Sequence, residues 1–452
     1  MRFGRVRRIC QLTAGIFLVA QVGLALERQP NADYHARREA LAAKLDGGVA
    51  LLFAPNEEEG PNDLYGYRPD DNFYYLTGWS EPGAAVLIAP SATATDSTGS
   101  RPYTEILFLP ARNQSQEKWT GPKLGPEDPQ ASQITGFPRV EVLDHLRDVL
   151  AGILYAGNPT IYTDLPAFEQ VSNSGSALDW LQRTNAFPVR ISFEDVRPLM
   201  SSLRTVKDAG EIELIRKADE ASIAAHFAAM HAVKPGMTER EISALMQYEW
   251  GKRGCERPAY APIVGSGFNS TVLHYSADSS TLQAGDVVVI DAAGEYSLYA
   301  ADITRTLPVS GKFTPRQREI YDIVLGAQQA AIAAFQSGKS TLTHNGDHSL
   351  YKVAYDYINS HGKDLHGQPL GQYFIHGLSH YIGLNVHDAG DYDVPLGPGM
   401  VFTIEPGIYI PEEKLGVRIE DDFYVDKDGK LIDLTAALPK TADEVEKAMA
   451  QR

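Results

Sequence analysis

The feature of this sequence that most constrains its fold is a short β-branched apolar run that ends in a carboxylate. Val287–Ile290 is typical of a buried strand, and Asp291 follows it directly. We expect a turn at Gly294, after which a second extended segment brings Asp302 back beside the first. A buried carboxylate is costly unless it is paired or binds a metal, so both carboxylates need a partner. Taken alone, the segment fits a salt bridge with Arg305 or a metal site.

The length and charge of the chain limit the classes of function that it can have. With 452 residues, the chain is long enough for two or three domains with cores of their own. Its formal net charge is −17 and its pI about 5.2, which argues against nucleic acid or an anionic membrane as a partner, because both attract basic surfaces. The acidic balance is compatible with a cation site and equally with a solvated surface.

The N-terminal segment has the pattern of a secretory signal peptide, which we place at residues 1–26. Arginines precede an apolar run, Leu12–Leu26, and Gly23–Ala25 supplies small residues for cleavage. The run is short for a membrane span. We therefore expect an exported protein, periplasmic or secreted, without an integral membrane domain; a retained N-terminal anchor is the alternative. Without the signal only Cys255 remains, so we expect no intramolecular disulfide.

The rest of the chain divides into two domains. Residues 27–190 predict an α/β domain, in which Phe73–Trp79 is one of the expected strands. Residues 191–207 predict a linker, because Pro198 interrupts the pattern there. Residues 208–452 predict a second domain, and the polar groups that suggest chemistry all fall within it.

The second domain has a doubled pattern. Asp208 with Glu211, and Thr238 with Glu241, form two capping boxes, each of which starts a helix. Segments with strand patterns follow, and the order of two helices and then strands recurs toward the C-terminus without sequence identity between the halves. A doubled unit of this kind predicts a site in the cleft between the halves.

The second half of this domain adds further polar residues in strand-like contexts. Glu405 lies inside an apolar run, and Arg418 and Glu420 are two residues apart, which places them on one face of a strand. Buried Asp and Glu residues are rare unless they are paired. A further segment that we expect to be extended carries three histidines, His376, His380 and His387.

Four carboxylates and one imidazole together predict a metal site. The carboxylates are those of Asp291, Asp302, Glu405 and Glu420. Such an oxygen-rich set has room for two divalent metal ions and suits Mn²⁺ better than a thiolate or multi-histidine set does. Two ions about 3.5–4 Å apart bridge a hydroxide and polarise a carbonyl. Arg418 and Thr304 are candidates to orient the ligands.

The motifs around these residues, taken in order, resemble those of a known family. They are Asp291-Ala-Ala-Gly-Glu-Tyr296 with Asp302-Ile-Thr-Arg-Thr306, His376-Gly-Leu-Ser-His380 with His387-Asp388, Thr403-Ile-Glu-Pro-Gly407, and Gly416-Val-Arg-Ile-Glu420. Together they look like Xaa-Pro aminopeptidase (aminopeptidase P), the proline-directed branch of the pita-bread dinuclear metallopeptidases. Arg68–Pro82 resembles the N-terminal domain of the same family. Ala293 departs from the pattern, because Gly is common there.

The resemblance implies a fold and an activity. The fold would be α+β, with a pita-bread (creatinase/aminopeptidase-like) catalytic domain after an α/β N-terminal domain. The activity would be release of the first residue from peptides with proline in second position, through a metal-bridging hydroxide. The partners would be proline-containing peptides, and we expect a homo-oligomer, a dimer or a tetramer.

The resemblance also implies a role for each site residue. The five metal ligands would be Asp291, Asp302, His380, Glu405 and Glu420, with Asp302 and Glu420 bridging both ions. Glu405 would also take the proton from the bridging water.

The remaining roles concern the substrate. His274 and His387 would lie near the scissile bond and stabilise the developing charge, and His387 would also contact the substrate. His376 would line the pocket, and Arg418 would brace the carboxylates and the substrate end.

Three alternatives stay open at the level of sequence. Prolidase cleaves only Xaa-Pro dipeptides on the same scaffold. A metal-free relative used as a binding module would have lost ligands, and so would a creatinase-like hydrolase; none is lost here.

Other candidate residues have simpler interpretations. His226 and His231 are expected to be packing or surface residues, and Cys255 a packing residue. Tyrosines at three positions are candidates to line a proline pocket or to belong to the core, namely Tyr260, Tyr275 and Tyr381.

Overall fold

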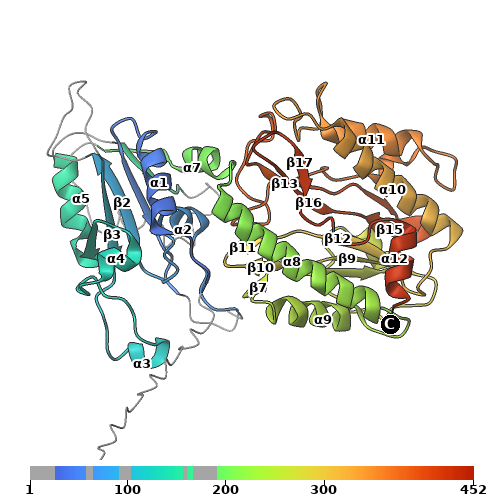
Figure 1. Ribbon diagram of the computed structural model, residues 1–452, viewed down its shortest axis with the longest axis horizontal. Coiled ribbons are helices and arrows are strands. Elements are labelled where there is room, and N and C mark those ends of the chain that lie inside the picture. Colours follow the sequence, from blue (N-terminus) through green and yellow to red (C-terminus); the bar gives the residue numbers. More distant parts are fainter. Residues whose placement is uncertain (1–25, 58–64, 91–102, 156–159, 166–190, 452) are drawn as a thin grey trace, which may run out of the picture.

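The computed structural model describes residues 26–57, 65–90, 103–155, 160–165 and 191–451. They form an N-terminal domain and a catalytic domain that lie side by side, joined at α7 (Arg197–Arg204) (Figure 1). The predicted signal peptide falls almost wholly outside the described residues. Within the described part of the chain, every helix is too short or too polar to cross a membrane.

A six-stranded mixed sheet forms the centre of the N-terminal domain. Its strands in spatial order are β4 (Arg139–Val142), β3 (Tyr103–Leu109), β2 (Ala85–Pro90), β1 (Val49–Phe53), β5 (Thr160–Thr163) and β6 (Ser192–Asp195). The central pairs β1–β2 and β2–β3 are antiparallel, and the outer pairs are parallel. In the described part of this domain, the helices that accompany the sheet are α1 (Asn31–Ala42), α2 (Asp71–Thr77), α3 (Glu117–Thr120), α4 (Ala131–Thr135) and α5 (Leu146–Tyr155).

Alternation along the strands produces two cores, because successive side chains point to opposite faces of a sheet. On one face, Leu51 and Leu87 pack against α5. On the other face, Leu52 and Val86 pack against α1 and α2. The second core continues across the domain boundary and includes Tyr299 of the catalytic domain.

The expected strand at Phe73–Trp79 is wrong, because this segment forms helix α2. Asp70 caps the helix by accepting a hydrogen bond from the main-chain N–H of Phe73 (2.9 Å), and Gly78 ends it in the left-handed region (φ 59°). Phe73, Tyr74 and Tyr75, the aromatic residues inside the helix, are all buried, so the helical period does not appear in the pattern of apolar residues.

The segment between the domains is more ordered than a linker. β6 pairs with β5 and forms an edge of the N-terminal sheet, and α7 follows it. Pro198 lies in the first turn of α7, where its missing N–H costs no intrahelical hydrogen bond.

Five helices support the catalytic domain, and both predicted capping boxes are present. In Figure 1, α8 runs from the domain boundary across the strands, with α10 and α11 beyond them. The helices are α8 (Ala209–Ala232), α9 (Glu239–Gly251), α10 (Pro315–Ala334), α11 (Leu350–Ser360) and α12 (Ala442–Met449).

The strands of this domain repeat the predicted order of helices followed by strands. The first half contributes β7 (Arg257–Pro258), β8 (Ile263–Ser266), β9 (Val287–Asp291), β10 (Gly294–Tyr296), β11 (Tyr299–Ala300) and β12 (Thr304–Pro308). The second half contributes β13 (Val401–Ile404), β14 (Gly407–Ile410), β15 (Leu415–Arg418), β16 (Asp421–Val425) and β17 (Leu431–Asp433). An isolated bridge between Thr304 and Glu420 joins the two halves.

The turn that we expected at Gly294 lies three residues later. Gly294 is part of β10, and the chain reverses at Ser297 and Leu298, whose φ values of 49° and 71° are those of a two-residue hairpin turn. The main-chain N–H of Ser297 donates to the Glu256 carboxylate (2.9 Å), and Leu298 is buried in the core at the domain boundary. These contacts offset the strain of a positive φ at Leu298.

The histidine-rich segment is also not the strand that we expected. A 3-10 helix, η4 (Leu370–Tyr373), precedes it, and an irregular chain then carries His376, His380 and His387. Part of this chain lies beside β13, where the main-chain N–H of Thr403 donates to His380 O (3.0 Å) and that of Glu405 donates to Leu378 O (2.9 Å).

Arg305 on β12 is a central contact between the halves. Its guanidinium is fully buried and donates to Asp421 Oδ1 (2.6 Å), Glu420 O (2.7 Å) and Pro439 O (2.9 Å). Burial alone would raise the pKa of Asp421, but Arg305 and Lys440 lower it to about 2. Arg305 therefore supports the strands that carry the site.

Replacing Arg305 with Met should destabilise the catalytic domain by about 3 kcal/mol, because Asp421 loses its nearest buried counter-charge. Urea unfolding followed by circular dichroism measures this change. Arg318→Met, which removes an exposed ion pair with Asp443 on the surface of α10, is the matched control and should leave the midpoint nearly unchanged. Equal midpoints for the two variants would contradict the role of Arg305.

Candidate metal centre

A cavity of about 540 Å³ lies between the two halves of the catalytic domain. It contains all the predicted site residues, since its lining includes Asp291, Asp302, His274, His376, His380, His387, Glu405, Arg418 and Glu420. These residues come from the turn after the 3-10 helix η3 (Gly267–Thr271), from β9, from the segment before β12, from the histidine-rich segment, and from the ends of β13 and β15. The cleft between halves that the doubled pattern predicts is therefore present.

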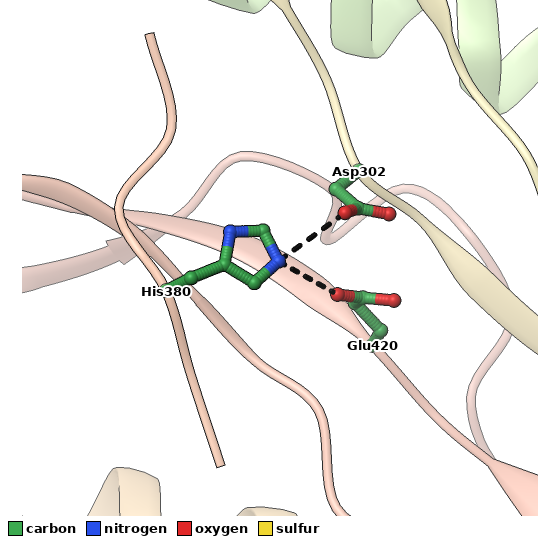
Figure 2. A group of neighbouring side chains, drawn as sticks. All are labelled: Asp302, His380 and Glu420. Atoms are coloured by element: carbon green, nitrogen blue, oxygen red, sulfur yellow. Dashed lines mark ion pairs between the residues drawn. The ribbon is translucent and has the colours of Figure 1, made fainter. Parts of the chain in front are cut away.

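The centre of the cavity wall is a compact group of three buried residues whose side chains could hold a metal ion, Asp302, His380 and Glu420. Figure 2 shows the His380 imidazole pointing between the two carboxylates. Its Nε2 lies 3.3 Å from Asp302 Oδ2 and 3.9 Å from Glu420 Oε1. The ligand atoms of all three residues lie within 4.8 Å of one another, close enough to share one metal ion.

Glu405 and Asp291 extend this group on two sides. Glu405 Oε1 lies 3.5 Å from His380 Nε2. Asp291 ends β9, and the register of β9 with β12 pairs it with Thr304, two residues beyond Asp302. The hairpin between the two aspartates therefore brings both to the same wall.

Hydrogen bonds from surrounding residues orient these carboxylates. The Tyr260 hydroxyl lies 2.6 Å from both Asp291 Oδ1 and Asp302 Oδ1, and its single proton can be donated to either. The Thr304 hydroxyl donates to Glu420 Oε2 (2.6 Å), and Arg418 Nη2 donates to Asp291 Oδ2 (2.5 Å). Partners of this kind fix the direction of metal ligands, which is the role expected for Thr304 and Arg418.

The substrate side of the cavity carries the other three histidines. His376 Nε2 lies 2.9 Å from the Tyr409 hydroxyl, which accepts from Arg418 Nη1 (2.7 Å). The rings of His387 and His380 are in contact, with centroids 4.4 Å apart. His274 and His387 are both exposed, so they lie at the mouth of the cavity, whereas the ligand residues lie at its base.

Burial and mutual repulsion raise the pKa of the carboxyl groups. Desolvation, with the neighbouring negative charges, raises the pKa of Glu405 to about 7 and raises those of Asp302 and Glu420. Burial would lower the pKa of His380, but its contact with Asp302 and the charge of Glu405 raise it to about 9. Burial lowers the pKa of His376 to about 3, so this imidazole is neutral.

The donor set fits divalent metal ions. Four carboxylates and one imidazole line one wall, and the guanidinium of Arg418 contacts only Asp291 among them. Among the described residues of this wall, the protonated His380 is the other cation that contacts these carboxylates, so four carboxylates face two cationic groups. Divalent cations supply the remaining positive charge, and oxygen-rich ligands with one imidazole suit them.

Two residues of the site were not assigned to it from the sequence. Tyr260 was one of three tyrosines considered for the pocket, and only the contact of its hydroxyl with both aspartates distinguishes it from the others. Tyr381 belongs to the core, and Tyr275 donates to Glu239 (2.9 Å). Tyr409 closes the motif that begins at Thr403, but the sequence assigned it no role.

The residues with simpler interpretations are placed as expected. His226 is buried, and its Nε2 lies 3.0 Å from the main-chain oxygen of Ala292. His231 is exposed, and Cys255 is buried in the core of the catalytic domain.

Comparisons with known proteins agree with the geometry. The model of metallopeptidase family M24 matches residues 213–427, and that of the aminopeptidase P N-terminal domain matches residues 34–162. The Xaa-Pro aminopeptidase of Escherichia coli (strain K12) is 34% identical over 445 residues, which cover 92% of this chain and 97% of the relative. Human Xaa-Pro aminopeptidase 3 is 31% identical over 465 residues, with 98% and 88% covered.

Solved structures give the same result. A putative aminopeptidase P from Bacillus anthracis superimposes with a TM-score of 0.83 at 30% identity, covering 94% of this chain and 99% of that one. Aminopeptidase P from E. coli with the inhibitor Pro-Leu superimposes with a TM-score of 0.80 at 32% identity, with the same coverage. The fold, the cluster of predicted ligands and the near-complete coverage agree: the chain belongs to the aminopeptidase P branch of metallopeptidase family M24, with the pita-bread fold.

Proposed function

We propose that this protein is a metal-dependent exopeptidase that releases the N-terminal residue from peptides with proline in second position. The observation that carries this proposal is the convergence of Asp291, Asp302, His380, Glu405 and Glu420 on one cavity wall, in a chain of the aminopeptidase P family. The relatives named Xaa-Pro aminopeptidase contribute the substrate class.

The five residues of the cavity wall would hold two divalent ions. Asp302, His380 and Glu420 form the compact group among them, with Glu405 beside His380 and Asp291 at the end of β9. When bound, the ions would supply positive charge that polarises the scissile carbonyl and activates a water nucleophile. We propose Mn²⁺ because oxygen ligands predominate in the set.

Glu405 is the residue best suited to move a proton. A carboxylate at this position in the cavity can accept a proton from the nucleophile and give one to the leaving nitrogen. It faces both the ligand group and the substrate side, since its Oε2 lies 3.7 Å from His376 Nδ1. A group between the two sides can transfer a proton from one to the other.

Three histidines and an apolar wall would orient the peptide. His274 and His387 at the cavity mouth would stabilise negative charge on the scissile carbonyl oxygen, and His376 would line the substrate side. The nitrogen of a proline peptide bond carries no N–H, so recognition must rely on the shape of the ring. Leu273 and Val386, which line the cavity, provide suitable apolar surface.

The cavity favours an aminopeptidase over a prolidase. All of its lining residues come from the catalytic domain, and none of the described residues of the N-terminal domain closes it. A peptide that continues beyond proline therefore meets no wall from this domain. All five ligand residues are present, which disfavours a non-catalytic binding module.

Three further proposals rest on sequence and family alone. We propose that residues 1–26 direct export to the periplasm or outside the cell, with a retained anchor as the alternative, because of their charge and apolar pattern. Two predicted domains follow, at 27–190 and 208–452. We also propose a homo-oligomer, a dimer or a tetramer.

The substrate proposal predicts a preference for length. With Mn²⁺, the protein should cleave an Xaa-Pro-Xaa tripeptide with a kcat/KM at least about tenfold above that for the Xaa-Pro dipeptide, which corresponds to about 1.4 kcal/mol of added transition-state binding. Chromatography of the released first residue measures both rates. Protein treated with a chelator should be inactive. Comparing the activity that Zn²⁺, Co²⁺ and Mn²⁺ each support tests which metal the site prefers. A preference for the dipeptide would identify a prolidase instead.

Loss of one ligand should abolish catalysis and leave the fold largely intact. Asp291→Ala should lower kcat/KM for the tripeptide by about 100-fold or more, because removing a direct ligand costs at least as much as removing its hydrogen-bonding partner. Asp443→Ala on the exposed face of α12 is the matched control. Metal content and circular dichroism are measured for both variants. Full activity of Asp291→Ala would refute the assigned site.

Metal binding should release protons. His380, with a pKa of about 9, and Glu405, with a pKa of about 7, both carry raised pKa values in the metal-free protein and must lose their protons to bind a cation. Affinity should therefore rise with pH from about pH 6 to about pH 9, with about one proton or more released at neutral pH. Calorimetry in buffers of different ionisation enthalpy counts these protons. An affinity independent of pH would contradict the assignment.

A further inference from the structure

Two cationic side chains that lie outside the cavity hold the loop that carries His387. Asp388, the next residue, is buried, and its carboxylate accepts hydrogen bonds from Lys207 (Nζ–Oδ2 2.9 Å) and Arg204. Both cations are more than nine-tenths buried. Burial would raise the pKa of Asp388, but the two cations lower it below its usual range, so the carboxylate stays charged. Withdrawing it would leave Lys207 without its buried counter-charge and Arg204 with only the more distant carboxylate of Asp71.

Close packing fixes the same loop against Lys207. A Cβ at Gly383 would lie 2.8 Å from Asp388 Cγ and 2.9 Å from Lys207 Cε, so only glycine fits there. The main-chain N–H of Lys207 donates to Gly399 O (2.8 Å), and that of Ala300 donates to Gly383 O (2.9 Å). The lysine and the loop therefore have little freedom relative to each other.

The N-terminal domain reaches the loop through a second set of contacts. Arg68 donates to Leu384 O and, through Nη1, to Asp71 Oδ1 (2.6 Å). Asp71, the first residue of α2, also contacts Asn385 and Arg204, at 3.4 Å each. Residues on both sides of His387 in the sequence therefore contact one network, in which cationic and anionic side chains alternate.

The position of His387 depends on this support. Its side chain is exposed and approaches the ligand group through the ring of His380. A shift of about 1 Å in a group that stabilises a transition state can cost about 100-fold in rate. The loop backbone, rather than contacts made by the imidazole, must then set the geometry of this histidine.

We propose that Lys207 and Arg204 are positioning residues for catalysis, which act through Asp388 to hold the His387 imidazole at the mouth of the metal-site cavity. The proposal rests on the proposed function and deepens it, because it assigns the segment between the domains a part in the reaction. Neither cation lines the cavity, so neither touches the substrate.

A double-mutant cycle on the full-length, metal-loaded protein tests this proposal. Lys207→Met should lower kcat for the Xaa-Pro-Xaa tripeptide by about 10-fold to 100-fold, with KM and metal content nearly unchanged. In a His387→Ala background the same substitution should change kcat by less than about twofold, because the residue through which it acts is already absent. Lys207→Arg, which keeps the charge, should retain most of the activity.

A second ion pair at the domain boundary provides the matched control. Lys217 on α8 pairs with Glu27 (2.6 Å) and does not contact the loop, so Lys217→Met should leave kcat unchanged. An equal loss of kcat from Lys207→Met in both backgrounds would show a merely structural effect and overturn the proposal. A folded Lys207→Met variant with full kcat would also overturn it.

Two further measurements distinguish a failure of the positioning role from a folding defect and from a failure of the proposed function. If Lys207→Met does not fold, Lys207→Gln, which keeps an N–H donor toward Asp388 without the charge, is measured in the same cycle. A wild-type protein that is inactive on the tripeptide would contradict the proposed function and leave the positioning role to be tested by NMR. The imidazole signals of His387 should then shift in Lys207→Met and not in Lys217→Met; unchanged signals would overturn the proposal.

Discussion

The repulsion among four carboxylates on one cavity wall determines how the catalytic domain is built. Burial raises the pKa of Glu405 to about 7 and raises those of Asp302 and Glu420, which shows that these groups are costly to ionise without a counter-charge. Arg418 pairs directly with Asp291 and offsets the charges of Glu405 and Glu420 only in part. A fold that keeps such a cluster is organised for cations, because bound divalent ions convert the repulsion into attraction.

The backbone around this wall must be rigid enough to hold the charges together. The main chain of Glu420 is fixed from both sides, since its N–H donates to Thr304 O (3.1 Å) and its carbonyl accepts from Arg305 (2.7 Å). Behind Asp302, the main-chain N–H donates to Asp422 Oδ2 (2.9 Å). Hydrogen bonds between the two halves therefore hold the backbone that carries the proposed ligands. These hydrogen bonds form only when the halves pack together.

Sequence reasoning found the residues of the cavity wall because their environment is local and unusual. A carboxylate at the end of an apolar run, such as Asp291 after β9, can be read from neighbouring residues, and the capping boxes of α8 and α9 are equally local. The prediction of a strand at Phe73–Trp79 is wrong because Phe73–Thr77 of α2 are all buried, so the sequence shows no helical period of apolar residues. The role of Tyr260 depends on two aspartates 31 and 42 residues away, and no local pattern encodes that contact.

The domain boundary and the metal site are connected by one short hairpin. β10 and β11 lie between Asp291 and Asp302, and the turn residue Leu298 is buried in an apolar core that also contains Phe73 of α2 and Met200 of α7. Tyr299 at the same turn donates to Glu211 (3.2 Å), the capping-box residue of α8. The N-terminal domain therefore buries the turn whose two strands lead to the two aspartates. Its packing stabilises the spacing of those ligands although it contributes no described residue to the cavity wall.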